Sequence, residues 1–293
     1  MRVGLVGTGA IGLPIAEQII KHGFELSFYA RRENVVSRLK AYGAKCCRLN
    51  ELGRNCDLVI FFLNTYDQCL ECLHEVIREM DEGIIIIGST ISPDEMQIIS
   101  EICARRGVDT VAAPVTGGVK GAEEGTLTIM TSGKSEIVQI ASPVLYSYGS
   151  RLVYAGEDVG AALVLKLLVQ LLVGINTLSM SEAMVLGTKN GLDPKLIYDT
   201  LCVSAGTSRI FENRGCTVIK RDFHTRAMVD TVAKDIKYCT ELARKSGVPS
   251  ILGQDCANVF QIAQNTLDDT TQDFSAIIQV YEKWAKVLVK EKD

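Results

Sequence analysis

Three glycines within the first twelve residues have the spacing of a phosphate-binding turn. They follow the apolar run Val3–Val6 and precede a segment with helical periodicity. In a strand–turn–helix unit, the first glycine permits a tight turn, the second lets a ligand approach the backbone, and the third lets helix and strand pack closely. The amino end of the helix then faces the phosphates with its partial positive charge. The residues that we expect to bind a dinucleotide here are Gly7, Gly9, Ala10, Ile11 and Gly12.

Two arginines follow the second expected strand, at residues 25–29. Sites for NAD usually place an acidic residue at this position to hold the ribose 2′-hydroxyl. Here Arg31 and Arg32 come first, and Glu33 follows them at the expected start of the next helix. A guanidinium group matches the geometry of a 2′-phosphate. The pair therefore predicts NADP rather than NAD, the alternative being exposed arginines at the start of a helix.

A lysine and an amide interrupt the apolar run of residues 159–175. Lys166 and Gln170 are four residues apart, so on a helix they share one face. An ammonium group in such surroundings must meet a partner, water or a cleft, because burying it unpaired is costly. Such a lysine can exchange a proton with a reacting oxygen, which makes Lys166 a candidate catalytic residue and Gln170 its neighbour in the site. The alternative is a structural lysine whose ammonium extends to solvent.

A hydroxyl followed by two glycines comes after the last strand expected in the first half of the chain. Thr116, Gly117 and Gly118 let backbone N–H groups converge beside a side-chain hydroxyl, which suits a carboxylate. The alternative is a flexible turn between domains.

The order of apolar segments predicts two domains in the 293 residues. Short apolar runs alternate with helical segments through the first half, which indicates a doubly wound parallel sheet of the α/β class. The expected strands are residues 3–6, 25–29, 58–63, 84–88 and 108–112. From about residue 159 only helical patterns remain. We therefore expect a dinucleotide-binding Rossmann-type domain at residues 1–158 and an all-helical domain for substrate binding and oligomerisation at residues 159–293.

Composition and charge exclude several classes of protein. A formal charge of -4 without any Lys/Arg block argues against a nucleic-acid partner or an anionic membrane. The apolar run of residues 159–175 carries two polar side chains and is short for a membrane span, so we expect a buried helix. A strand directly after Met1 leaves no room for a signal peptide, so we expect a cytoplasmic protein with reduced cysteines. The spacing Cys69-x-x-Cys72-x-His74 lacks a second ligand pair, so no metal site is expected.

Taken together, these motifs resemble the β-hydroxyacid dehydrogenase family from one end of the chain to the other. Residues 7–16 match the family pattern G-x-G-x-M-G-x-P-M-A. The longest match is residues 113–130, which follow D-A-P-V-S-G-G-x-x-G-A-x-x-G-T-L-T-I-M. Shorter family motifs match as well: M-L-P at residues 62–64, S-[ST]-x-x-P at 89–93, K-D-L at 234–236 and D-x-S-A at 273–276. The larger relative 6-phosphogluconate dehydrogenase fits less well because its helical domain is much longer.

The resemblance implies an NADP-dependent oxidoreductase that interconverts a small β-hydroxy acid and its semialdehyde by hydride transfer. It implies that Lys166 is the acid/base, that Gln170 orients the substrate, and that the glycine pair with its hydroxyl binds the substrate carboxylate. It also implies a homodimer or homotetramer. The further positions that it assigns to cofactor binding are Arg31, Leu63, Asn64, Thr90 and Lys234.

Several positions depart from the family pattern. Ala162 replaces a glycine, Val169 and Gln170 replace two asparagines, Ala112 replaces an aspartate, and Asn64 replaces a proline. These changes leave open a substrate of different shape or a loss of activity. Two alternatives follow. One is an imine reductase of the same architecture, although imine reductases usually lack a lysine at the position of Lys166. The other is a non-catalytic NADP-binding sensor or scaffold.

Overall fold

The chain folds into two units whose limit lies inside one long helix. The computed structural model describes residues 1–224 and 227–291. The first unit is Met1–Lys166 and the second is Leu167–Asp293. The expected domain limit after residue 158 falls in the turn just ahead of this helix and stays a prediction.

The first unit is built on a parallel sheet with the strand order β3-β2-β1-β4-β5-β6. The strands β4 and β5 are apolar at every position, because helices cover both faces of the sheet. The order reverses between β1 and β4, and ligands bind such sheets at the carboxyl ends of the strands beside this reversal. The strands are β1 (Arg2–Val6), β2 (Glu25–Tyr29), β3 (Lys45–Cys46), β4 (Leu58–Phe61), β5 (Ile84–Ile87) and β6 (Asp109–Ala112).

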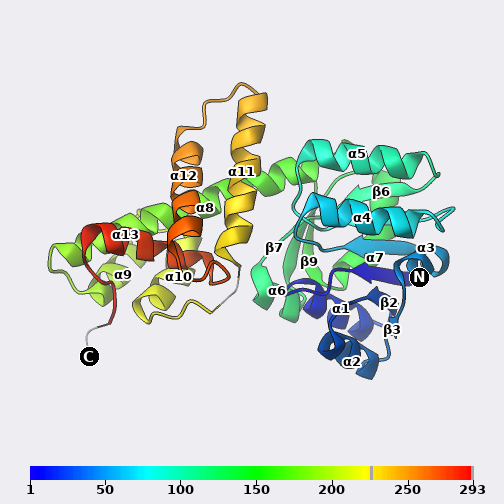
Figure 1. Cartoon of the computed structure of the whole chain (residues 1–293), viewed down its shortest axis with the longest axis horizontal. Coiled ribbons are helices and arrows are strands. Elements are labelled where there is room, and N and C mark those ends of the chain that lie inside the picture. Colours follow the sequence, from blue (N-terminus) through cyan, green and yellow to red (C-terminus); the bar gives the residue numbers. More distant parts are fainter. Residues whose placement is uncertain (225–226, 292–293) are drawn as a thin grey trace. The chain divides into compact units, whose positions relative to one another are not determined.

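Helices connect the consecutive strands of this sheet. Figure 1 shows α1 (Gly12–Lys21) and α2 (Glu33–Ala41) on one side of it, and α4 (Tyr66–Ile77) and α5 (Pro93–Ala104) on the other. The helix α3 (Leu49–Asn55) packs against α4. The sequence itself marks the start of α5. Ser92 and Glu95 form a capping box, and Pro93 between them is the first residue of the helix.

A smaller sheet follows, with the order β7-β8-β9. The pairing is antiparallel between β7 and β8 and parallel between β8 and β9. An isolated bridge between Ala112 and Ser132 joins the carboxyl end of β6 to the residue that follows β8. The elements of this part are β7 (Val115–Thr116), α6 (Gly118–Glu124), β8 (Leu127–Thr131), α7 (Ser135–Tyr146) and β9 (Gly149–Tyr154).

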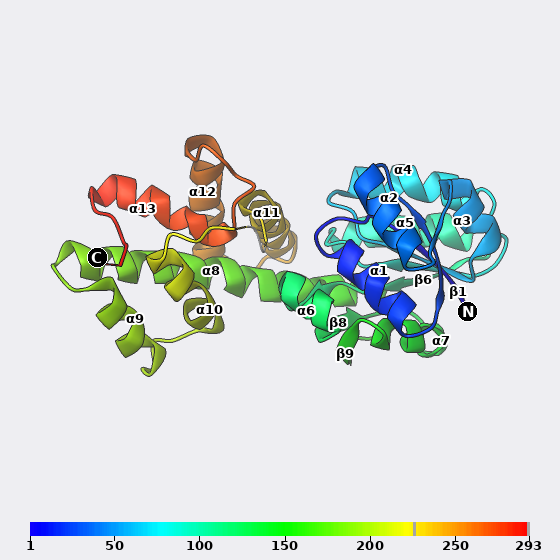
Figure 2. The same ribbon diagram turned by 90° about the horizontal axis from the view of Figure 1, so that it is seen from below.

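The second unit is helical among its described residues. Figure 2 shows α9 and α10 on one side of α8, and α12 and α13 on the other. Two apolar cores hold it together, one around Ile236 and Phe260 and one around Met184 and Phe211. Its helices are α8 (Ala161–Lys189), α9 (Pro194–Cys202), α10 (Arg209–Ile219), α11 (Val229–Lys245), α12 (Ile251–Thr266), the short 3-10 helix η1 (Phe274–Ile277) and α13 (Ile278–Ala285). The predicted fold class, a doubly wound sheet followed by a helical region, is confirmed.

Helix α8 is the one helix among residues 1–224 and 227–291 that is long and apolar enough, by length and composition, to cross a membrane. A long core helix of a soluble protein meets the same criterion. In the second unit α8 contributes Leu178, Met180 and Met184 to the apolar cores.

Candidate active site

The three glycines after β1 are required for different reasons. Gly7 has a φ of +96°, and a Cβ there would overlap the carbonyl oxygen of Phe62. A Cβ at Gly12 would overlap the carbonyl oxygen of Gly7, so the protein's own packing demands both glycines. A Cβ at Gly9 would meet nothing within 4 Å, which leaves the backbone open to a ligand. No side chain caps the start of α1 at Ile11, and an uncapped helix start beside the open Gly9 fits a dinucleotide phosphate.

The two arginines after β2 have different surroundings. Arg32 donates a 2.7 Å hydrogen bond from Nη2 to the carbonyl oxygen of Thr8, so its guanidinium holds the glycine turn. Both arginines are exposed, and Glu33 begins α2. Arg32 therefore helps to shape the glycine turn, and Arg31 precedes Arg32 after the same strand.

The loop after β4 contains two of the residues expected at the cofactor. The N–H of Leu63 donates a 2.7 Å hydrogen bond to Oγ of Ser89, and the N–H of Asn64 donates to Oε1 of Gln68 at 3.2 Å. Thr90 follows Ser89 at the end of β5 and is half-buried. The hydrogen bond of Ser89 thus brings the strand ends that carry Leu63 and Thr90 together.

The predicted carboxylate site lies where β7 ends. Thr116 pairs with Thr128 of β8, and the next two residues both have positive φ, +127° at Gly117 and +67° at Gly118. A Cβ at Gly118 would meet nothing within 4 Å, so a small ligand can reach this backbone. Residues with side chains rarely adopt this conformation, which explains the glycine pair.

Lys166 lies in the second turn of α8, and the start of that helix is held by Ser132. Oγ of Ser132 accepts a 3.0 Å hydrogen bond from the N–H of Ala162 and donates one of 2.8 Å to the carbonyl oxygen of Val159. Ser132 directly follows β8, the strand that pairs with the predicted substrate loop. One strand therefore positions both Thr116, through pairing, and the helix that carries Lys166, through Ser132.

Gln170 and Lys234 are linked through Asp235 in the second unit. Nε2 of Gln170 donates a 2.6 Å hydrogen bond to Oδ2 of Asp235, whose side chain is buried. Nζ of Lys234 lies 2.8 Å from Oδ1 of the same carboxylate and 5.1 Å from the centre of the Tyr238 ring. Two residues expected from the sequence thus share one buried carboxylate.

Three residues that support the predicted site, directly or through the start of α8, are not among the residues predicted from the sequence. Ser89, Ser132 and Asp235 each contact a backbone group or side chain at least 26 positions away in the chain. Two of them stood in recognised motifs, Ser89 at the head of S-[ST]-x-x-P and Asp235 in K-D-L. Their place in these two motifs is the signal from which Ser89 and Asp235 could have been found. Ser132 lies in no such motif.

The cysteines are unsuited to metal binding where their surroundings are apolar. Burial raises the pKa of Cys56 to about 11 and that of Cys103 and Cys256 to about 12, so these thiols stay protonated near neutral pH. Cys69 and Cys72 lie in α4, and the Cys69 thiol donates to Oγ of Ser89 at 3.3 Å. Within the described residues, no three His, Cys, Asp or Glu side chains come together as a metal site.

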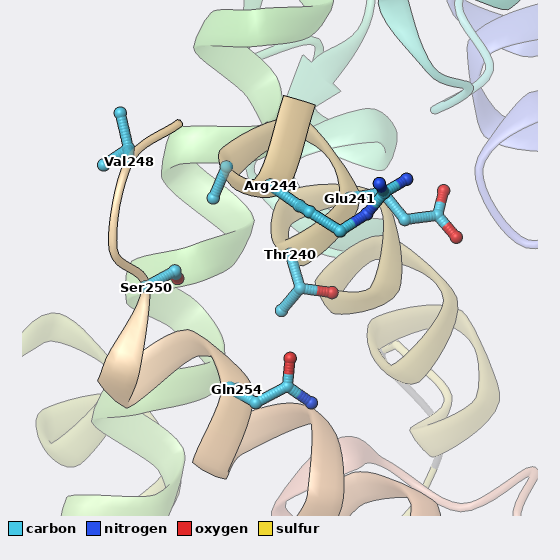
Figure 3. A pocket seen from close by; sticks show the side chains of 7 residues that line it. Thr240, Glu241, Arg244, Val248, Ser250 and Gln254 are labelled. Atoms are coloured by element: carbon cyan, nitrogen blue, oxygen red, sulfur yellow. The ribbon is translucent and has the colours of Figure 1, made fainter. Parts of the chain in front are cut away.

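Two surface hollows lie apart from these residues. One of about 330 Å³ lies between the starts of α5 and α8. The other, of about 300 Å³, lies between α11 and α12, where the Arg244 side chain extends toward Glu241 (Figure 3). Among the described residues, the walls of both hollows contain none of the predicted site residues.

Two models of protein families together match most of the chain. Residues 2–156 match the NAD-binding domain of 6-phosphogluconate dehydrogenase, and residues 160–281 match the NAD-binding model of NADP-dependent 3-hydroxyisobutyrate dehydrogenase. The chain is 32% identical to an L-threonate dehydrogenase of Cupriavidus necator, over 95% of each protein. It is 30% identical to a 2-(hydroxymethyl)glutarate dehydrogenase of Eubacterium barkeri, over 99% of this chain and 97% of the relative.

A solved structure shows the same fold over nearly the whole length. The 3-hydroxyisobutyrate dehydrogenase from Salmonella typhimurium superposes with a TM-score of 0.89 at 27% identity, over 96% of this chain and 99% of that one. The expected family is therefore confirmed. The chain belongs to the β-hydroxyacid dehydrogenase family, whose members are NAD(P)-dependent dehydrogenases that act on CH–OH groups.

Proposed function

We propose that this protein is an NADP-preferring oxidoreductase that interconverts a small β-hydroxy acid and its semialdehyde, with Lys166 as the acid/base. The observation that supports this most directly is the shared strand β8. It pairs with the loop that carries Thr116, and through Ser132 it holds the helix that carries Lys166. A carboxylate-binding loop and a lysine on elements fixed to one strand suit a substrate that has a carboxylate near its reacting carbon.

The preference for NADP rests on Arg31. No acidic side chain stands between the end of β2 and this arginine, so a ribose 2′-hydroxyl lacks its usual acceptor. A 2′-phosphate there would meet the guanidinium of Arg31. The pyrophosphate would meet the uncapped start of α1. The other residues proposed to contact the cofactor are Leu63, Asn64, Thr90 and Lys234.

In the oxidative direction, Thr116, Gly117 and Gly118 bind the substrate carboxylate, and Lys166 in its amine form accepts the proton of the hydroxyl. The hydride of the carbon that bears this hydroxyl would pass to a bound nicotinamide, so the C–H and O–H bonds break and a C=O bond forms. In the reductive direction the Lys166 ammonium returns the proton to the developing alkoxide and stabilises its charge. Gln170 orients the reacting groups from one turn further along α8.

The experiment is a set of turnover assays with matched lysine variants. NADPH oxidation is followed with succinic, methylmalonic and tartronic semialdehydes and with glyoxylate. NADP⁺ reduction is followed with L-threonate, L-serine and 3-hydroxyisobutyrate, the substrates that the names of the relatives suggest. Lys166→Ala is compared with Lys189→Ala, which removes an exposed lysine at the end of the same helix.

We expect Lys166→Ala to lower kcat by about 10²-fold or more, the usual contribution of a general acid–base group, while the affinity for NADPH is unchanged. Lys189→Ala should turn over like the wild type. Equal turnover by Lys166→Ala would remove the lysine from the mechanism. Nucleotide binding with no turnover of any of these compounds would support the sensor alternative, and turnover of a cyclic imine would support an imine reductase.

A further inference from the structure

The end of the β4–β5 ladder is completed by a side chain. The carbonyl oxygen of Phe61 accepts hydrogen bonds from the N–H groups of Gly88, at 2.9 Å, and Ser89, at 3.1 Å. Phe62, which faces the other neighbouring strand, donates to the carbonyl oxygen of Val6 in β1 at 2.8 Å. The N–H of Leu63 is then bound by Oγ of Ser89, at 2.7 Å.

The opposite side of the same peptide faces the glycine turn. The carbonyl oxygen of Phe62 and the N–H of Leu63 belong to one peptide group and point in opposite directions. That carbonyl oxygen lies so close to Gly7 that a Cβ there would overlap it. The Phe62–Leu63 peptide is therefore held between Ser89 on one side and Gly7 on the other, and it joins the loops that follow β1, β4 and β5.

The hydroxyl of Ser89 has no hydrogen-bonding capacity left for a ligand. A serine hydroxyl has one donor and two acceptor sites. Ser89 donates to the carbonyl oxygen of Phe61 at 3.3 Å and accepts from Leu63 and from the thiol of Cys69, and its residue is 3% exposed. The ring of Phe62 lies over Gly88, where a Cβ would overlap it, so the loop is also fixed by packing.

We propose that Ser89 is a positioning residue for the dinucleotide. Its hydroxyl fixes the orientation of the Phe62–Leu63 peptide, which sets the position of Leu63 and Asn64 and supports the Gly7 turn from behind. The inference rests on the proposed role of Leu63 and Asn64 at the cofactor. It predicts a loss of nucleotide affinity from a residue that never touches the nucleotide.

The test compares Ser89→Ala, which removes the acceptor, with Ser89→Thr, which keeps a hydroxyl. The matched control is Ser100→Ala, which removes another serine oxygen of the same unit, the acceptor of a 2.8 Å hydrogen bond from Thr110. Kd for NADPH is measured by the change in its fluorescence, and the shift in Tm on adding NADPH is measured beside it. Neither measurement requires turnover, so both are independent of the choice of substrate.

We expect Ser89→Ala to bind NADPH about tenfold more weakly, the scale expected for leaving one buried N–H without its acceptor. Ser89→Thr should stay within about threefold of the wild type, and Ser100→Ala should not differ from it. In turnover assays, KM for the nucleotide should rise while kcat at saturating nucleotide changes little. If Ser89 only stabilised the fold, Ser89→Ala would lower Tm and would leave the KM for the nucleotide unchanged.

Wild-type affinity in Ser89→Ala would overturn the proposal while leaving the proposed function intact. If Ser89→Ala does not fold, Ser89→Cys takes its place, since a thiol keeps the size of the side chain but is a weak acceptor. Ser89→Cys should then show an intermediate Kd, and an unchanged Kd would again overturn the proposal. A wild type that binds neither NADPH nor NADH would contradict the proposed function together with this inference.

Discussion

The amide of Gln170 donates its 2.6 Å hydrogen bond to a carboxylate, Asp235, that also lies 2.8 Å from the Lys234 ammonium. This contact fixes which way the amide faces. Its Nε2 points to Asp235, so its Oε1 is turned to the other side. The carbonyl end of Gln170 is thus directed away from Asp235, one turn of α8 after Lys166. Gln170 has one methylene group more than the family's asparagine, and its amide reaches this carboxylate.

Shortening this amide should destabilise the second unit. In Gln170→Asn the side chain loses one methylene group, and the buried carboxylate of Asp235 loses its amide donor. We expect the free energy of unfolding to fall by about 1–3 kcal/mol, the cost of leaving a buried polar group unsatisfied. Urea denaturation measures the change. Gln254→Asn, on the surface of α12, is the control and should have no effect; an equal loss in both variants would contradict this reading of the contact.

Arg31 and Arg32 should affect nucleotide binding in different ways. Arg31→Ala removes the proposed 2′-phosphate ligand, so the Kd for NADPH should rise at least tenfold while the Kd for NADH stays the same. Arg32→Ala removes the hydrogen bond to the Thr8 carbonyl, which both nucleotides would need, so both affinities should fall to a similar degree. Fluorescence titration with each nucleotide distinguishes the two roles. Tighter binding of NADH than of NADPH by the wild type would reject the NADP preference.

Ser132→Ala should act on the reaction rather than on the nucleotide. The variant loses the hydroxyl that binds the Ala162 N–H and the Val159 carbonyl at the start of α8. Helix-capping groups of this kind contribute about 0.5–2 kcal/mol. We expect lower stability in urea and a kcat reduced by about tenfold, which corresponds to roughly 1.4 kcal/mol in the barrier, because Lys166 is less well placed.

The Kd for NADPH should be unchanged in Ser132→Ala. Ser150→Ala is the control, because its exposed hydroxyl donates only to the Thr126 carbonyl. A kcat equal to that of the wild type in both variants would show that the hydrogen bonds of Ser132 at the start of α8 do not contribute to catalysis.

The ion pair between Arg2 and Asp57 should make stability depend on pH in the acid range. The hydrogen bonds from Arg2 hold the pKa of Asp57 below its ordinary value, which means that folding favours the charged carboxylate. This contribution is complete above the pKa of the unfolded chain and disappears as the pH falls through the lower pKa of the folded state. Asp57→Asn should therefore cost stability at pH 7, and the difference from the wild type should shrink below about pH 4.

Chemical denaturation at several pH values measures this difference. The control is Asp81→Asn, since the Asp81 side chain is 95% exposed and its contact with Arg106 is 3.5 Å long. A difference between wild type and Asp57→Asn that stays constant from pH 7 to pH 3 would contradict the assignment.

The longer strands of the sheet in the first unit could be predicted because each is a short apolar run in the sequence. The strand predicted at residues 25–29 has the observed bounds of β2, and the apolar runs from residues 58 and 84 begin where β4 and β5 begin. The predicted strands at 58–63 and 84–88 are too long at their ends. There the backbone leaves the ladder, and contacts between loops decide the path, as they do at Phe62 and Ser89.

Several short elements and the helix α10 escaped prediction. The start of α10 depends on Ser208, whose hydroxyl accepts a hydrogen bond from the N–H of Phe211. The elements β3, α3, β7 and α6 span between two and seven residues, too few for a periodic pattern. The residues that support the candidate site share a related difficulty. Ser132 and Asp235 matter because of partners brought near by folding, which no local pattern reveals.

The glycine turn contains two kinds of constraint that a motif search does not separate. A descendant of this protein that no longer needed a nucleotide would still have to keep Gly7 and Gly12, because its own carbonyl groups occupy the space of any side chain. It could lose Gly9 without cost, since nothing of the protein fills that space. A substitution at Gly9 would thus be the first sign in the turn that nucleotide binding is no longer required. This chain has a glycine there.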